Sequence, residues 1–231
     1  MIALLDWDTS FFGYKVGVLH LENQEKLTEL LNAESDFKLV YIFSKEKLNI
    51  PHSENYSAKW VDTKIVLKKP SHKTIEALTD AEIVSYFGKD DEAIHALALE
   101  SGIYSRFNID TNFTNNEFEK LYHEWIKKSL DKTLSEIVYI AYVNNNVAGF
   151  ITVGRKNHRA DIGLIAVNKE FRGRNIGLSL IEKASQYAFL EGFEEIQVIT
   201  QGENIPAMKL YSKSGFTIEE TTFVYHAWRN E

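Results

Sequence analysis

The stretch that most constrains the fold is "EFRGRNIG", from Glu170 to Gly177, which lies between two apolar segments. The segment before it, "IGLIAV", has the character of a buried strand, and "LSLIEKASQYAFL" after it has that of a helix. A helix that begins directly after such a turn points unpaired backbone amides at the turn. Those amides and the helix dipole favour a phosphate group. The order of elements therefore predicts an α/β fold with an anion-binding turn.

The residue types inside the turn fit a diphosphate cradle. Gly173 and Gly177 allow a ligand to approach the backbone, and Asn175 tolerates the left-handed conformation better than most residues. Arg172 and Arg174 can add charge-assisted hydrogen bonds to phosphate oxygens. The pattern is neither a Walker loop nor G-x-G-x-x-G. Taken alone, the turn is explained equally well as a solvated basic segment that caps the helix.

Composition limits the classes of function. The chain has 231 residues, which suits one large or two small domains, and its net charge of −7 argues against a nucleic-acid partner. It contains no cysteine, which excludes disulfides and thiolate zinc sites and fits a reducing cytoplasm. The N-terminus lacks the basic region of a signal peptide, and no apolar run reaches the length of a membrane span.

Hydrophobic periodicity predicts alternating strands and helices in two unequal parts. The polar stretch "KKPSHK" marks the boundary, so we expect a small N-terminal α/β domain at 1–75 and a larger domain at 76–231. The predicted strands are 14–21, 38–44, 61–69, 82–87, a hairpin across 144–146, 160–167, 194–200 and strands within 216–228. The predicted helices are 23–34, 89–101, 114–132, 176–190 and 204–213.

A second motif follows the turn after one helix and one strand, and its residues are Asn204, Ala207, Leu210, Tyr211, Gly215 and Phe216. Together the two motifs resemble the GNAT family of N-acetyltransferases, and the resemblance covers about residues 80–231. It implies a mixed, largely antiparallel sheet that is splayed at an acetyl-CoA site. Asn175 departs mildly from the family pattern, which most often has glycine there. In the turn, the matching residues are Arg172, Gly173, Arg174, Asn175, Ile176 and Gly177.

A narrower resemblance covers nearly the whole chain. "DWDTSFFG" at Asp6–Gly13 and "YSRFNID" at Tyr104–Asp110 are similar to the TDP-fucosamine acetyltransferases within GNAT. That family acetylates the 4-amine of TDP-4-amino-4,6-dideoxy-D-galactose and carries a small N-terminal α/β part. The resemblance implies a cytoplasmic enzyme of cell-surface polysaccharide biosynthesis that acts on a nucleotide-linked amino sugar in a ternary complex, and it implies a homodimer.

The GNAT resemblance also implies roles for individual residues. Ile165, Ala166 and Val167 would contact the cofactor through their backbone, and an amide near Ala166 or Val167 would stabilise the oxyanion. Tyr211 would protonate the leaving thiolate, because a phenol with a pKa of about 10 stays protonated at neutral pH. Core packing is the alternative for Tyr211. Asn204 would contact CoA, cap a helix, or do both.

The acceptor site is predicted from the narrower motifs. Arg106 would meet a phosphate of the sugar nucleotide while Tyr104 or Phe107 stacks on a ring, and the alternative is a loop with anchored aromatics. Phe11 and Phe12 would wall the sugar site, or form a hydrophobic plug.

Several questions stay open from the sequence. The general base is not singled out among His158, Asp161 and Glu203, and water is a further alternative.

The seven histidines show no H-E-x-x-H pair, so we expect no metal. We expect an acetyl-CoA-dependent N-acetyltransferase; a GNAT enzyme for another amine and a non-catalytic acyl-CoA-binding module are the alternatives.

Overall fold

The computed structural model describes residues 2–21, 24–32, 36–73, 79–88 and 92–230. The chain divides into two compact units: unit 1 is Met1–Ile65, Gln201–Glu203 and Glu220–Glu231, and unit 2 is Val66–Thr200 and Asn204–Glu219. The boundary expected between residues 75 and 76 falls in 74–78, outside the described residues. The C-terminal segment belongs to unit 1, whereas the sequence-based division assigned it to the second domain.

Unit 1 is a small α/β arrangement. Its strands follow the order β1, β2, β3, β10, β4. Strand β2 is parallel to β3, and β3 is antiparallel to β10. Leu27 and Leu31 of its second helix pack with strand residues such as Ile42 and Tyr225 in one apolar core. The elements are β1 (Ala3–Leu4), α1 (Asp6–Phe12), β2 (Val16–Leu21), α2 (Glu25–Asn32), β3 (Leu39–Ser44) and parts of β4 (Tyr56–Pro70) and β10 (Thr217–Arg229).

Unit 2 carries the basic turn. Antiparallel pairing joins β5 to β6, β6 to β7 and β7 to β8, and parallel pairing joins β8 to β9. The predicted mixed, largely antiparallel sheet is therefore confirmed. Besides parts of β4 and β10, the elements are β5 (Glu82–Ser85), α3 (Glu92–Ser101), α4 (Arg106–Ile109), α5 (Glu117–Leu130), β6 (Ile137–Val143), β7 (Asn146–Lys156), β8 (Arg159–Val167), the 3₁₀ turn η1 (Lys169–Phe171), α6 (Ile176–Leu190), β9 (Glu195–Gln201) and α7 (Ile205–Lys213).

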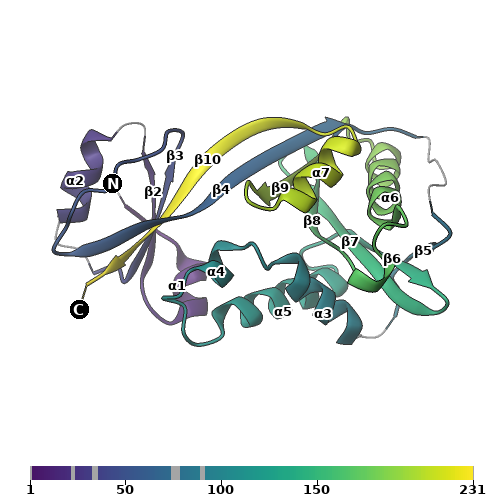
Figure 1. Ribbon diagram of the computed structural model, residues 1–231, viewed down its shortest axis with the longest axis horizontal. Coiled ribbons are helices and arrows are strands. Elements are labelled where there is room, and N and C mark those ends of the chain that lie inside the picture. Colours follow the sequence, from purple (N-terminus) through teal and green to yellow (C-terminus); the bar gives the residue numbers. More distant parts are fainter. Residues whose placement is uncertain (1, 22–23, 33–35, 74–78, 89–91, 231) are drawn as a thin grey trace. The chain divides into compact units, whose positions relative to one another are not determined.

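Helices cover both faces of the central strands of unit 2. Figure 1 shows α6 on one side of β6, β7 and β8, and α3 and α5 on the other. Residues 148–154 of β7 are accordingly all buried. A strand covered on both faces needs apolar residues in succession, which explains the run "AGFITVG".

The hairpin from β6 to β7 follows its sequence closely. Val143 pairs with Asn146, and the two residues between them, Asn144 and Asn145, have φ values of 50° and 63°. Two left-handed residues form the turn type that matches the twist of the flanking strands. Asparagine adopts this conformation at low cost, so "NNN" predicts the hairpin correctly.

Two short helices were not predicted from the sequence. Helix α1 occupies Asp6–Phe12 and ends at the left-handed Gly13. Helix α4 occupies Arg106–Ile109, in a stretch interpreted as a loop; the Ser105 hydroxyl caps it by accepting from the Phe107 amide at 3.3 Å. The first residues of the predicted helix 89–101 and both ends of 23–34 lie outside the described residues. No described helix has both the length and the apolar character needed to cross a bilayer.

Candidate active site

Strands β8 and β9 pair only at the beginning and then separate. Their register runs from Ala160 opposite Ile196 to Ile162 opposite Val198. Strand β8 continues to Val167 and β9 to Gln201 without further pairing between them in the described residues. The backbone of β8 beyond Ile162 therefore has one side that no strand covers, as expected for the predicted splay.

The direction of the β8 amides decides which of them face this open side. The Asn168 amide donates to the Ala148 carbonyl of β7 at 2.9 Å. Amide direction alternates along an antiparallel strand. The Ala166 amide therefore points toward β7, while the amides of Ile165 and Val167 point toward the open side. This geometry favours Val167 over Ala166 as the oxyanion donor.

The basic turn leads into α6 through left-handed residues. Gly173 has a φ of 81°, and Asn175, the residue before the helix, has a φ of 57° and a side chain that does not cap the helix. The Ser179 amide donates to the carbonyl of Asn175, the capping residue, at 3.0 Å. The amides of 176–178 therefore lack partners within the helix. The Ile176 side chain is buried, so its backbone is the part that can serve a ligand.

The two glycines of the turn differ in their surroundings. A Cβ atom placed on Gly173 would have no atom within 4 Å, so its backbone is open to a ligand. A Cβ atom on Gly177 would lie 3.2 Å from Leu210 and 3.6 Å from Val167. Gly177 therefore allows α6, α7 and the end of β8 to pack closely. The Cβ side is thus open at Gly173 and filled at Gly177, while ligand contact through the Gly177 amide stays a prediction.

Both arginines of the turn are paired with acids. Arg172 is ion paired with Glu100 of α3, and its Nε donates to the Val167 carbonyl at 3.1 Å. Arg174 is ion paired with Asp80. These pairs are at the surface, where an ion pair contributes little to the stability of the fold.

Tyr211 lies on α7 and Asn204 directly precedes that helix, whose Leu210 packs next to Gly177 of α6. Asn204 caps the helix, since its Oδ1 accepts from the Ala207 amide at 3.1 Å, and its Nδ2 donor is not used in this cap. Tyr211 is 3% exposed and packs against Phe216. Burial raises the pKa of the Tyr211 hydroxyl, which keeps it protonated at neutral pH. Both interpretations of Tyr211, core packing and proton donation, fit this position.

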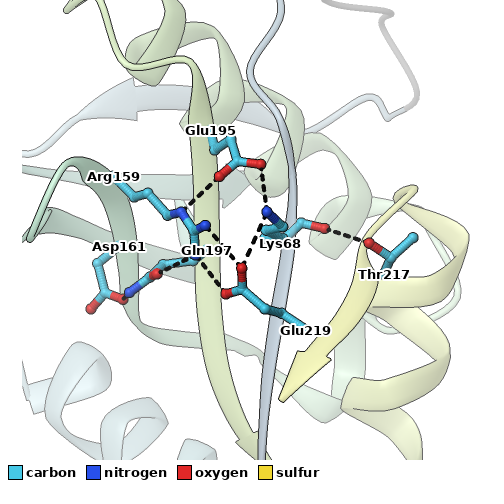
Figure 2. Close-up of polar contacts among 7 residues, drawn as sticks. All are labelled: Lys68, Arg159, Asp161, Glu195, Gln197, Thr217 and Glu219. Carbon is cyan, nitrogen blue, oxygen red and sulfur yellow. Dashed lines mark hydrogen bonds and ion pairs between the residues drawn. The ribbon is translucent and has the colours of Figure 1, made fainter.

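A charged network surrounds the first residues of β8 (Figure 2). Lys68 lies 2.9 Å from Glu195 and 3.1 Å from Glu219, and the Arg159 guanidinium lies 2.7 Å and 2.5 Å from the same two carboxylates. Hydrogen bonds from Arg159 and Lys68 lower the pKa of Glu219 to about 2. The four alternating charges form a closed ring across four strands.

This network orients Asp161 through Gln197. Arg159 donates to Gln197 Oε1 at 3.4 Å, and Gln197 Nε2 donates to Asp161 Oδ1 at 2.7 Å (Figure 2). Because arginine can only donate, the Gln197 amide must turn its nitrogen toward Asp161. Burial raises the pKa of Asp161, while the Gln197 hydrogen bond opposes that rise. The carboxylate is thus held on β8, one residue before the last β8–β9 pair.

The predicted acceptor residues of unit 2 surround α4. The guanidinium carbon of Arg106 lies 4.7 Å from the centre of the Phe107 ring, and that ring lies 5.5 Å from the ring of Phe113. Tyr104 is half-buried just before the helix. The structure thus places Arg106 on a helix stabilised by aromatic packing, while its role toward an acceptor stays a prediction.

The predicted acceptor residues of unit 1 lie on α1. Phe11 stacks on Trp7 with ring centres 5.0 Å apart and meets Phe12 edge to face at 5.0 Å. Both phenylalanines are half-buried, whereas Trp7 is 49% exposed. Trp7 was not among the site residues predicted from the sequence, although its i,i+4 spacing from Phe11 places both on one face once a helix is assumed.

The residues of the turn fit a diphosphate. Amides without intrahelical partners and an unobstructed Gly173 lie at one helix start, two surface arginines belong to the same turn, and the open side of β8 leads away from it. No cluster of three or more His, Asp or Glu side chains suited to a metal ion occurs among the described residues.

Comparison with known proteins agrees with this geometry. The Acetyltransferase (GNAT) family matches residues 102–216. The chain is 23% identical to the dTDP-fucosamine acetyltransferase of Escherichia coli O6:H1 over 96% of both chains. It is 27% identical to SpsD, a spore coat polysaccharide biosynthesis protein of Bacillus subtilis, over 60% of this chain and 48% of that protein. The chain therefore spans nearly all of one relative and about half of the other.

A solved GNAT structure supports the fold. The putative acetyltransferase of Novosphingobium aromaticivorans has a TM-score of 0.55 and 17% identity, with 89% of this chain and 80% of that chain covered. The chain carries an acetyltransferase domain of the GNAT family, and acetyl-CoA is its acyl donor.

Proposed function

We propose that this enzyme transfers the acetyl group of acetyl-CoA to the 4-amine of a dTDP-4-amino-4,6-dideoxyhexose. The observation that carries this proposal is the alignment with a dTDP-fucosamine acetyltransferase along 96% of both chains, which includes unit 1 as well as the GNAT domain. A relative named for polysaccharide biosynthesis supports the same substrate class. The lack of cysteine fits a reducing cytoplasm as the place of this reaction.

The reaction needs an amine to attack the thioester carbon while an oxyanion forms and a thiolate leaves. The amides at the start of α6 and Arg174 bind the diphosphate, and the open side of β8 orients the acyl arm. The Val167 amide then donates to the carbonyl oxygen, where negative charge develops. Holding both reactants in this way lowers the barrier by roughly 7–11 kcal/mol in favourable systems.

Proton transfer completes the proposed chemistry. Of the three candidate bases, His158 and Glu203 are exposed, whereas Asp161 is half-buried, oriented by Gln197 and has a raised pKa. Of the three, a carboxylate with these properties is the best suited to accept the proton that the amine loses. Six residues of strand β8, about 20 Å, separate Asp161 from Val167, so the proton reaches the carboxylate through intervening water. Tyr211 donates a proton to the departing thiolate.

The acceptor contacts stay as the sequence predicts them. Arg106 meets a phosphate of the nucleotide, and Tyr104 or Phe107 stacks on a ring. The roles of Phe11 and Phe12 as walls of the sugar site rest on the sequence resemblance.

Mass spectrometry of an acceptor panel tests the proposal. The enzyme is incubated with acetyl-CoA and each of several dTDP-linked 4-amino sugars, the corresponding free amino sugars, a polyamine and a peptide with a free N-terminus. We expect one added acetyl group on one dTDP-amino sugar and release of one equivalent of CoA. Acetylation of the polyamine or peptide alone would assign the enzyme to a different amine. CoA binding without acetylation of any amine would favour a binding module.

A further inference from the structure

One backbone group at the end of β8 loses its partner because β9 separates. The Asn168 amide donates to Ala148 of β7. Since a trans peptide points its N–H and C=O in opposite directions, the Val167 carbonyl points away from β7. In a continuous sheet that carbonyl would accept from the next strand, but β9 pairs with β8 only as far as Ile162.

The Arg172 side chain takes the place of that strand. Its Nε donates to the Val167 carbonyl at 3.1 Å, and the far end of the same guanidinium is ion paired with Glu100 at the end of α3. Arg172 therefore connects the end of β8 to a helix of the same unit. The contact satisfies the Val167 carbonyl and leaves the Val167 amide uncovered. A complete neighbouring strand would cover both groups.

Arg174 provides a contrast two residues later. Its guanidinium is ion paired with Asp80, which is 68% exposed, and among the described residues it has no bond to the β8 backbone. Exchanging this surface pair for a phosphate disrupts no strand geometry. The two arginines, equivalent in sequence, thus have different surroundings.

We propose that Arg172 is a positioning residue, which substitutes for strand β9 and holds the Val167 peptide in the conformation that receives the acyl arm, while Arg174 is the arginine that binds phosphate. This inference rests on the proposed cofactor site and reassigns one residue within it. It predicts that the neutral variant Arg172→Gln keeps the positioning, since glutamine Nε2 lies as many bonds from its backbone as arginine Nε.

The test measures two ligands by calorimetry, without any acceptor. One is CoA, and the other is 3′-phosphoadenosine 5′-diphosphate, which has the phosphates but lacks the pantetheine arm. For Arg172→Met we expect CoA to bind about tenfold more weakly, the size of one lost hydrogen bond to a partly buried group. The nucleotide should bind as it does to the parent, and Arg172→Gln should recover most of the lost CoA affinity. Arg174→Gln should weaken both ligands.

The outcomes separate positioning from phosphate binding. Equal weakening of both ligands by Arg172→Met and Arg172→Gln would identify Arg172 as a phosphate ligand and overturn the inference, as would unchanged CoA binding in Arg172→Met. Glu100→Gln, which removes the other anchor of the guanidinium, should weaken CoA and spare the nucleotide, and it provides the same test if Arg172→Met does not fold. Failure of the parent to bind CoA would overturn the cofactor site itself.

Discussion

The ring of Tyr211 packs edge to face against the ring of Phe216, with centroids 5.6 Å apart and planes inclined by 62°. The contact holds the phenol in a buried site next to the junction of α6, α7 and β8. Removal of the hydroxyl alone would leave this packing in place. The pair therefore allows catalysis and packing to be separated by experiment.

Tyr211→Phe should lower turnover by about 100-fold or more, the usual contribution of a positioned acid. The melting temperature and the affinity for CoA should stay close to those of the parent, because the ring still packs. Steady-state kinetics at saturating substrates measures the effect. An acyl donor with a more acidic thiol should restore the variant more than the parent; normal turnover without such rescue would leave Tyr211 as a core residue.

Gly173→Val should abolish stabilisation by CoA. A ligand at 100 times its dissociation constant stabilises a protein by about 2.7 kcal/mol, and valine at a φ of 81° is strained and obstructs the turn. Thermal unfolding with and without CoA measures the shift. Gly192→Val is the matched control, since Gly192 has a φ of 82° and equally open surroundings beyond the other end of α6. The interpretation fails if both variants keep the shift or both lose it.

Asp161→Asn should lower turnover while raising stability at neutral pH. Burial raises the pKa of Asp161 above its ordinary 3.8, so the ionised carboxylate destabilises the folded state once the pH exceeds the folded pKa. Asparagine retains an oxygen that can accept from Gln197. Urea unfolding should show the variant more stable at pH 7, with the gain lost toward pH 3.8 and below.

The pH dependence of turnover gives the second readout for Asp161. If the carboxylate is the base, the acidic limb of the parent's profile should disappear in Asp161→Asn, and turnover should fall by about 100-fold or more. His158→Ala and Glu203→Gln, which change the other two candidates, should leave the limb intact. An unchanged pH profile in Asp161→Asn would exclude Asp161 and assign the role of general base to water.

Arg106→Ala should raise the KM for the acceptor about tenfold, the effect of one lost charge-assisted hydrogen bond. The KM for acetyl-CoA should not change. Arg155→Ala is a suitable control, because Arg155 also packs on an aromatic ring, that of Phe193. Equal changes in both KM values would exclude Arg106 from the acceptor site.

Glu219→Gln should destabilise the enzyme in a way that depends on pH. Hydrogen bonds from Arg159 and Lys68 lower the pKa of Glu219 from 4.5 to about 2, so the stabilisation is present above pH 4.5 and is lost as the pH falls toward 2. As the pH is lowered from 7 to 3, the urea midpoint of the variant should approach that of the parent. High salt should reduce the difference at pH 7, because these groups are partly exposed. A constant difference at every pH would contradict this account.

The sequence by itself determined the strand, turn and helix around 170–177, because apolar periodicity and the left-handed preference of glycine and asparagine are local properties. It also determined the hairpin at Asn144–Asn145 for the same reason. Helix α1 was not predicted, because a helix of seven residues shows too little hydrophobic periodicity to be identified. For α4, the sequence signal that could have predicted the helix is Ser105, which caps its start.

The tertiary structure alone decided which partner each side chain meets. The missing side chain of Gly177 lets α6 pack closely against Leu210, which the sequence did not indicate. Arg172 and Arg174, alike in sequence, face different partners. The environment of Asp161 depends on Gln197, 36 residues later in the chain. The last strand, β10, pairs with β3, which precedes it by more than 150 residues. Such contacts arise from chain segments that only the complete fold brings together, and local sequence does not encode their distances.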